Sequence, residues 1–358
     1  MHMQQQELDF FLGALSPTGF SSYYTQVVKD AETQTSALLK AGPGCGKSTL
    51  LRRIAAHLEE QGETVELIHC SSDPDSLDGV ICGARKFSVV DATPPHVLEP
   101  VYPVAFEDIV SLYRAVDRHK LQAHRSEIIS LFRQNKALVE RATRYITAAG
   151  SLLQDSMRVA LSCTDTAKAR AFAGTLSRRY ISSSGEAPHE EIRLLSALTL
   201  QGIIFYSNTI AKLADTTVVL DDEYGAASRT LLYALREEAL QKGHNIVTCY
   251  CSMSPYEKIE HLIIPALRLC FVTSNSYHPI QFSGQRTIHC TRFCNKEGLK
   301  LRRKRLHFNK RAVDELFAQA SSIQKEAKEC HDALEQYYID AVDFTFLEKA
   351  YQYLLTTL

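Results

Sequence analysis

The chain has 358 residues, of which 45% are hydrophobic and 23% are charged, and its formal net charge is −1 at pH 7. This length allows two ordinary globular domains, and the composition excludes a disordered or low-complexity protein. The balanced charge excludes an overall basic field of the kind that attracts nucleic acid or anionic lipid. The first residues lack a signal-peptide pattern, and no apolar run reaches membrane-spanning length, so we expect a cytoplasmic protein without a membrane partner.

A glycine-rich turn between a strand and a helix is the strongest motif. Residues 36–62 read SALLKAGPGCGKSTLLRRIAAHLEEQG, which predicts an apolar strand, a turn and an amphipathic helix. The turn fits the phosphate-binding P-loop, whose glycines let the backbone present N–H groups to phosphate oxygens at a helix amino end. A glycine-rich helix start without a ligand is the alternative. The predicted nucleotide-binding residues are Gly42, Pro43, Gly44, Cys45, Gly46, Lys47, Ser48 and Thr49.

The polar residues of this motif have separate expected roles. Lys47 supplies positive charge to the β and γ phosphates, and the Ser48 hydroxyl is a ligand of magnesium. Thr49 is expected near the α phosphate. The motif therefore predicts a nucleoside triphosphate as the partner, with ATP and Mg²⁺ as cofactors.

Two further strands are expected at residues 65–69 and 87–91, and the second ends in Asp91. A carboxylate at the carboxyl end of a strand beside the P-loop can hold the water shell of magnesium. We therefore predict Asp91 as a metal ligand and catalytic residue alongside Lys47. An ordinary strand that ends in a turn-forming aspartate is the alternative.

The segment 69–79 is expected to be a loop on the same side of the sheet as the P-loop. Asp73 and Asp78 are predicted catalytic residues there, because either carboxylate could orient an attacking water or support the metal. Turn chemistry explains these aspartates equally well. His96 could contact the γ phosphate or a substrate, or could simply lie at the end of a loop.

The sequence repeats itself at a nearly constant spacing. Offsets that change so little along the chain indicate a tandem duplication of one P-loop domain. The matching segments are 14–24 with 197–207, 44–53 with 225–234, 69–74 with 250–255, and 88–96 with 270–278.

The second copy has lost the residues on which phosphate binding depends. In the repeat alignment, Ser228 stands for Lys47, Arg229 stands for Ser48, and Thr273 stands for Asp91. Acidic residues at 221–223 would also repel phosphates. We therefore expect the carboxyl-terminal half not to bind Mg-NTP in the usual way.

Each half continues into a long helical stretch with apolar residues at three- and four-residue steps. We expect these stretches to pack as helical hairpins in their own halves. The Ser- and Gly-containing linker at 182–188 marks the boundary. The predicted fold is α/β, with two tandem P-loop NTPase-like domains built on mainly parallel sheets. The predicted domains are 1–188, with a helical insertion at about 105–180, and 189–358, with a degenerate P-loop and carboxyl-terminal helices.

Two smaller features leave alternatives open. The basic cluster between Lys296 and Arg311 could be a solvated face, a source of an arginine for the first site, or a nucleic-acid contact. Arg229 is equally eligible to be such an arginine. Ten scattered cysteines, including the pairs Cys249/Cys251 and Cys290/Cys294, are expected to be reduced and to pack in the core rather than to bind zinc. The basic side chains for nucleic acid would be Lys300, Arg302, Arg303 and Arg305.

The segments GPGCGKST, HCSSDPDSLDGV and VVDATPPH, together with SPYEKIEHLIIP and VTSN in the second half, resemble a group of uncharacterised bacterial two-domain P-loop ATPases. The resemblance covers nearly the full length. It implies ATP binding at residues 47–49, with Asp91 as the magnesium-side carboxylate. In that group both halves carry a phosphate loop, so this chain departs from the pattern at 221–229.

The expected function is therefore an ATPase with one active site in the first half and an inactive, regulatory second half. Its nucleotide state would change how the two halves pack. A phosphotransferase acting on a small molecule or nucleotide is one alternative, with Asp73, Asp78 or His96 as base. An ATP-stabilised scaffold with little turnover is the other. The sequence does not identify a protein or small-molecule partner.

Overall fold

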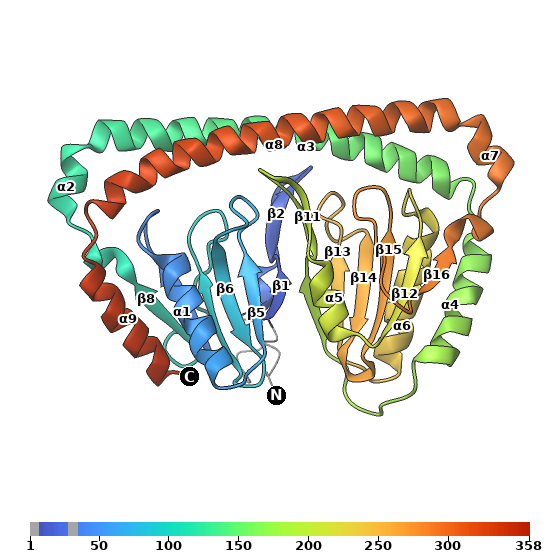
Figure 1. Cartoon of the computed structure of the whole chain (residues 1–358), viewed down its shortest axis with the longest axis horizontal. Helices are drawn as coiled ribbons and strands as arrows, with labels where there is room; N and C mark the ends of the chain where they lie inside the picture. Colours follow the sequence, from blue (N-terminus) through green and yellow to red (C-terminus); the bar gives the residue numbers. More distant parts are fainter. Residues whose placement is uncertain (1–6, 28–34) are drawn as a thin grey trace.

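The computed structural model describes residues 7–27 and 35–358; residues 1–6, part of the segment without a signal-peptide pattern, lie outside the described residues. Two α/β halves stand side by side, and two long helices lie across the top of both (Figure 1). Among the described helices, none combines the length and the apolar character needed to cross a membrane.

The first half contains a six-stranded sheet in the order β1-β5-β6-β7-β4-β8. Strand β6 is antiparallel to β5 and β7, and the other neighbouring strands are parallel. A hairpin of β2 (Gly13–Ser16) and β3 (Gly19–Ser22) accompanies this sheet. The sheet and its first helix consist of β1 (Glu7–Phe10), β4 (Thr35–Lys40), α1 (Lys47–Glu60), β5 (Val65–His69), β6 (Leu77–Cys82), β7 (Phe87–Asp91) and β8 (Glu107–Ser111).

The second half repeats this arrangement in the order β9-β13-β14-β15-β12-β16. Its middle strand β14 is again antiparallel to both neighbours, and a hairpin of β10 (Ser196–Thr199) and β11 (Gly202–Phe205) again accompanies the sheet. The other elements are β9 (Glu190–Arg193), α5 (Ser207–Leu213), β12 (Thr216–Asp221), α6 (Ala226–Gln241), β13 (Ile246–Tyr250), β14 (Ile259–Ile264), β15 (Leu269–Ser274) and β16 (Arg286–His289). The α/β class and the repetition are confirmed, and each sheet is mostly parallel with one antiparallel strand.

The strands predicted at 65–69 and 87–91 are present as β5 and β7, and α1 follows the predicted helix. Every residue of β7 is buried, which explains its mainly apolar sequence before Asp91. The prediction of a loop at 69–79 was wrong at its end, because Leu77–Cys82 form strand β6. Residues 107–111, inside the segment expected to be helical, form β8.

The sequence led us to expect that the long helices form hairpins within their own halves, and this prediction was wrong. Instead α3 (Arg125–Leu161) packs along α8 (Arg303–Ile339), each helix having 37 residues and each running from one half to the other (Figure 1). Short helices precede them, α2 (Arg118–Ala123) and α7 (Lys296–Leu301). The apolar stripes that predicted two separate hairpins therefore build one shared pair of helices.

The last helix of each half crosses over to the other half. Helix α4 (Thr166–Tyr180) packs against α6 of the second half, and α9 (Phe344–Thr356) packs against α1 of the first half. The crossing is symmetrical, because Asp117 N–H donates to the Ala341 carbonyl at 2.8 Å and its counterpart Asn295 N–H donates to the Cys163 carbonyl at 2.7 Å. Residues 181–189 form the coil between α4 and the second half.

The two halves meet just after β1 and β9, and α5 packs against β1. Phe11 and Leu194, which occupy matching positions in the repeat, exchange two backbone hydrogen bonds of 2.8 and 2.9 Å. The buried guanidinium of Arg193 crosses the junction to the Glu66 carboxylate at 2.7 Å. One hydrophobic core contains buried residues of both halves, such as Phe10 and Phe271. The halves are therefore joined below by a core and above by the crossed helices.

Candidate functional site

The predicted P-loop lies at the carboxyl edge of the first sheet, between β4 and α1. Gly46 is the residue before the helix, with φ 78°, and Gly44 has φ 64°, so both occupy the left-handed region that favours glycine. The Lys47 ammonium turns back over the loop and donates to the Gly42 carbonyl at 2.9 Å. This arrangement leaves the first N–H groups of α1 directed towards the same edge, as anion binding requires.

Sheet topology brings Asp91 to Lys47. Strands β4 and β7 are parallel neighbours, with Leu39 paired to Asp91, so the loop after β4 and the end of β7 meet at one edge. Asp91 Oδ2 lies 3.5 Å from Lys47 Nζ, and Asp91 Oδ1 accepts hydrogen bonds from the backbone and hydroxyl of Thr93. These two predicted catalytic residues therefore form one ion pair, in which Asp91 is buried and Lys47 is half-buried.

The structure adds neighbours to Asp91 that the sequence analysis weighed separately. Asp78, Asp91 and His96 are buried, and each offers a ligand atom within 4.8 Å of the other two. Asp78 accepts a hydrogen bond of 3.1 Å from the Tyr24 hydroxyl, and the Tyr24 ring stacks on His96 with centroids 4.5 Å apart. Tyr24 was missed because only the fold brings the segment before β4 to this edge; its place in the repeat gave no chemical signal.

Burial and charge act against each other in this cluster. Burial raises the pKa of Asp78, and the Asp91 charge adds to that effect. Burial would also raise the pKa of Asp91, but His96 and Lys47 outweigh it, so the pKa of Asp91 is lowered. Burial would lower the pKa of His96, but Asp91 and Asp78 outweigh it and raise the pKa. The geometry thus favours an ionised Asp91 between two cationic groups.

The end of α8 and the start of α9 cover the P-loop. The Glu335 carboxylate accepts a hydrogen bond of 3.1 Å from Gly44 N–H. A Cβ atom at Gly42 would lie 2.6 Å from the Tyr338 ring, and one at Gly46 would lie 2.6 Å from Leu347. The glycines of the loop therefore serve close packing of this cover as well as the turn itself.

The other predicted site residues lie in different surroundings. Asp73 pairs with Lys328 of α8 at 3.4 Å, and Asp78 belongs to strand β6 rather than to a loop. The Ser48 hydroxyl accepts a hydrogen bond of 3.0 Å from Leu77 N–H, and Thr49 is exposed. Asp78 therefore joins the Asp91 cluster, whereas Asp73 contacts the cover over the loop. Pro43 is half-buried and Cys45 is buried in the first-half core.

The matching edge of the second sheet is built differently. The loop between β12 and α6 spans only residues 222–225, against 41–46 in the first half, because α6 begins two residues earlier in the repeat. The buried Asp222 carboxylate accepts hydrogen bonds from Ala227 N–H at 2.9 Å and Ser228 N–H at 2.7 Å. An internal carboxylate therefore occupies the helix end that a phosphate would need.

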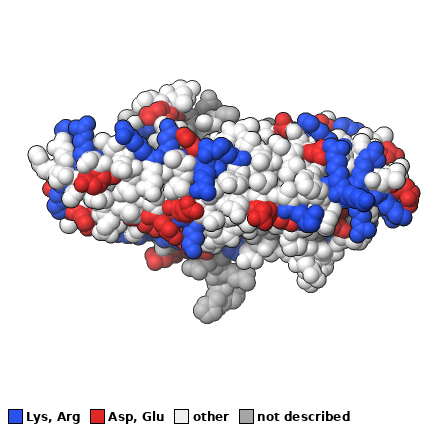
Figure 2. All heavy atoms as spheres, turned by 90° about the horizontal axis from the view of Figure 1, so that it is seen from above, with Lys and Arg blue, Asp and Glu red and all other residues white. Residues whose placement is uncertain are grey.

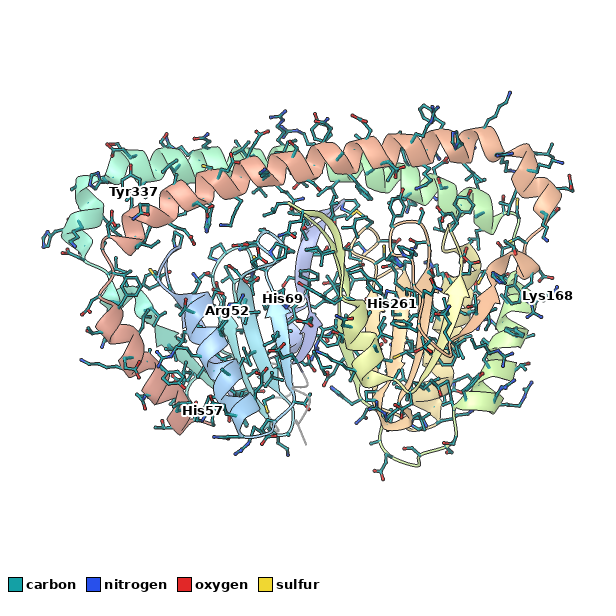
Figure 3. All side chains as sticks on the ribbon, in the orientation of Figure 1. Arg52, His57, His69, Lys168, His261 and Tyr337 are labelled. Carbon is teal, nitrogen blue, oxygen red and sulfur yellow. The ribbon has the colours of Figure 1, made fainter. Side chains whose placement is uncertain are left out.

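Part of the first-half cluster has a counterpart in the second half. Glu260 stands on β14 where Asp78 stands on β6, and its carboxylate lies 3.3 Å from His278, the counterpart of His96. His261, which is labelled in Figure 3, is buried next to Glu260 and His278. Burial lowers the pKa of His261 to about 3. The carboxylate and histidine thus recur in both halves, whereas Lys47 and Asp91 have no counterparts of the same type in the second half.

The basic cluster lies far from the P-loop. Its side chains project from α7 and the start of α8, where blue atoms gather at one end of Figure 2. Glu335 contacts the P-loop some thirty residues later on the same helix, or about 45 Å at 1.5 Å per residue. The alternative that this cluster supplies an arginine to the first site is therefore wrong within one chain. Arg305 pairs with Asp155 instead. Arg229, on α6, lines a cavity of the second half rather than the first site.

All ten cysteines are free thiols, and neither metal-like group of the described residues includes one. Comparison of the chain with protein-family models, curated proteins and solved structures gives no match. The resemblance to two-domain P-loop ATPases therefore stays a prediction from the motifs.

Proposed function

We propose that the first half binds Mg-ATP and hydrolyses it. The observation that supports this most is the 3.5 Å approach of Lys47 to Asp91 at the edge where the glycine loop enters α1. In such a site the lysine and the helix end hold phosphate groups, while a nearby carboxylate holds the metal. The second half then takes no part in the chemistry.

The donor set suits magnesium in part. Asp91 and the Ser48 hydroxyl offer the oxygen ligands that magnesium prefers, and when bound the ion would offset phosphate charge. His96 is a poorer magnesium ligand because its donor is nitrogen. We assign it instead to holding Asp91 ionised, together with Lys47. The stacked ring of Tyr24 keeps the imidazole in that position.

Nucleotide binding would require Glu335 to leave Gly44 N–H, because a phosphate oxygen and this carboxylate need the same donor. The two negative groups would also repel each other. We therefore propose a regulated ATPase, in which the end of α8 covers the loop in one state and moves away in another. Since α8 also spans the second half, this motion would carry the nucleotide state to that half.

Phosphate release from ATP alone tests this proposal. Wild-type protein is expected to bind Mg-ATP in calorimetry and release phosphate, and Lys47→Ala is expected to lose both. Lys136→Ala, an exposed lysine on α3, is the matched control and should behave as wild type. Absence of magnesium-dependent binding of every nucleoside triphosphate would refute the proposal. Transfer of label to an added metabolite would support a phosphotransferase instead, and tight binding without turnover a scaffold.

A further inference from the structure

A cavity of about 580 Å³ lies at the carboxyl edge of the second sheet, beneath α3 and α8. This volume falls within the range of sites that hold small molecules. The cavity occupies the place in the second half that corresponds to the covered P-loop edge in the first. It lies outside the proposed ATP site, and none of the chemistry proposed above uses it.

The roof of the cavity, formed by α3 and α8, includes apolar side chains. Met157 of α3 and Val313 and Phe317 of α8 line it from above. Counted from the first residue of each long helix, Met157 stands at the position of Glu335. The residue that reaches down to close the first edge is therefore replaced by one without charge, and Gly150 similarly stands at the position of Lys328. The second edge keeps an open space where the first is filled.

The floor carries one cation that lacks a carboxylate partner. Of the three basic residues lining the cavity, Lys258 pairs with Glu260 at 3.0 Å and Lys310 pairs with Asp314 at 3.4 Å. Within the described part of the chain, Arg229 makes no ion pair, and its guanidinium lies 5.9 Å from the Tyr233 ring centroid. A half-buried guanidinium is a strong, planar donor for a carboxylate or a similar anion.

One atom of a second buried side chain that lines the cavity has no partner, although the other ring nitrogen of that side chain lies 3.3 Å from Glu260. His278 lines the cavity and is 4% exposed, and its Nδ1 atom makes no hydrogen bond among the described residues. Buried polar atoms in folded proteins almost always have a partner, so a ligand or an ordered water is expected there. Triphosphate is a poor fit, because Asp222 already accepts from the end of α6.

We propose that this cavity binds a small organic anion with an apolar body. Its carboxylate or sulfonate would pair with Arg229, and its hydrocarbon or aromatic part would lie beneath Met157, Val313 and Phe317. His278 Nδ1 would supply a second polar contact. The apolar side chains of the roof supply affinity, and the unpaired guanidinium supplies the preference for an anion.

Two naphthalene probes test the proposal without nucleotide, so the result is independent of the proposed ATPase. The anionic probe is 8-anilinonaphthalene-1-sulfonate, and the neutral one is N-phenyl-1-naphthylamine. Fluorescence titration of the folded wild type is expected to give one site per chain. Arg229→Gln is expected to weaken the anionic probe about tenfold and to leave the neutral probe unchanged. Arg133→Gln, an exposed α3 arginine, is the control.

The second part of the test uses substitutions that fill the cavity. Met157→Trp and Val313→Phe are expected to reduce binding of both probes, while thermal unfolding and circular dichroism show that the variants remain folded. Measuring two variants on different helices keeps the test decisive if one fails to fold. Absence of probe binding to wild type, several equivalent sites per chain, or binding unaffected by Arg229→Gln and by a folded filled variant would each overturn the proposal.

Discussion

The carboxyl edges of the two sheets occupy matching positions in the repeat but differ in their side chains and in what covers them. In the first half, Lys47 and Asp91 meet beneath a charged cover in which Glu335 contacts the glycine loop. In the second, Asp222 caps the shortened loop and a cavity replaces the cover. The strand order is the same in both halves. The difference teaches that a few side chains at a sheet edge, and not the sheet itself, decide what can bind there.

The largest predicted effect concerns the carboxylate that only the first half retains. Asp91→Asn is expected to lower ATP turnover by about a hundredfold or more while leaving much of the nucleotide affinity, because the metal-side charge is lost but Lys47 remains. Steady-state phosphate release and calorimetry measure the two quantities separately. Asp215→Asn, an exposed change in the second half, serves as control. Unchanged turnover in Asp91→Asn would remove Asp91 from the mechanism.

The second prediction concerns the cover over the first edge. Glu335→Ala is expected to tighten Mg-ATP binding about tenfold, since Gly44 N–H is freed and a negative charge near the phosphates is removed. Glu329→Ala on the exposed side of the same helix is the control. Weaker binding in Glu335→Ala than in wild type would show that this carboxylate supports the nucleotide rather than competing with it.

The third prediction uses a titratable group that only the second half has, since Gly79 stands in the first half where His261 stands in the second. Burial lowers the pKa of His261 to about 3, whereas an unfolded histidine has a pKa near 6.5. Between these values the unfolded chain binds the extra proton, so stability falls as pH falls below about 6.5. The loss approaches about 1.4 kcal/mol per pH unit.

Denaturant unfolding of wild type and His261→Phe at several pH values measures this contribution. The difference in unfolding free energy between the two proteins is expected to change in favour of the variant as pH is lowered from 6.5 to 4.5. His57→Phe, on the outer surface of α1 and labelled in Figure 3, is the control without this trend. A pH-independent difference would show that His261 does not remain neutral in the folded protein.

The smallest effect is expected from restoring a single lysine. Ser228→Lys is predicted not to create a second Mg-ATP site, because Asp222 still occupies the helix end and the loop remains two residues shorter. Calorimetry should therefore give the same stoichiometry as wild type. Saturable binding at two sites would show that the lost lysine alone separates the two halves.

The sequence predicted the local elements around the first site well. The glycine spacing, Lys47, and the buried strand ending in Asp91 are local patterns, and the α/β class and the duplication followed from them. The antiparallel strand β6 was missed, because the Ser-Asp-rich turn that predicted a loop leads directly into it. Asp78, which we expected in a loop to orient an attacking water or support the metal, was consequently misplaced: it lies on strand β6, where the Tyr24 hydroxyl donates to it.

Sequence by itself determined which residues repeat, which half keeps the lysine and carboxylate, and where the strands and the helix next to the glycine-rich loop form, because those depend on spacing along the chain. Only the tertiary structure decided that α3 and α8 cross between halves, so that Glu335 closes the first edge and Met157 roofs the second. An apolar stripe on a helix indicates that the helix packs against another element, but it does not identify that element. That choice depends on contacts between residues more than a hundred positions apart.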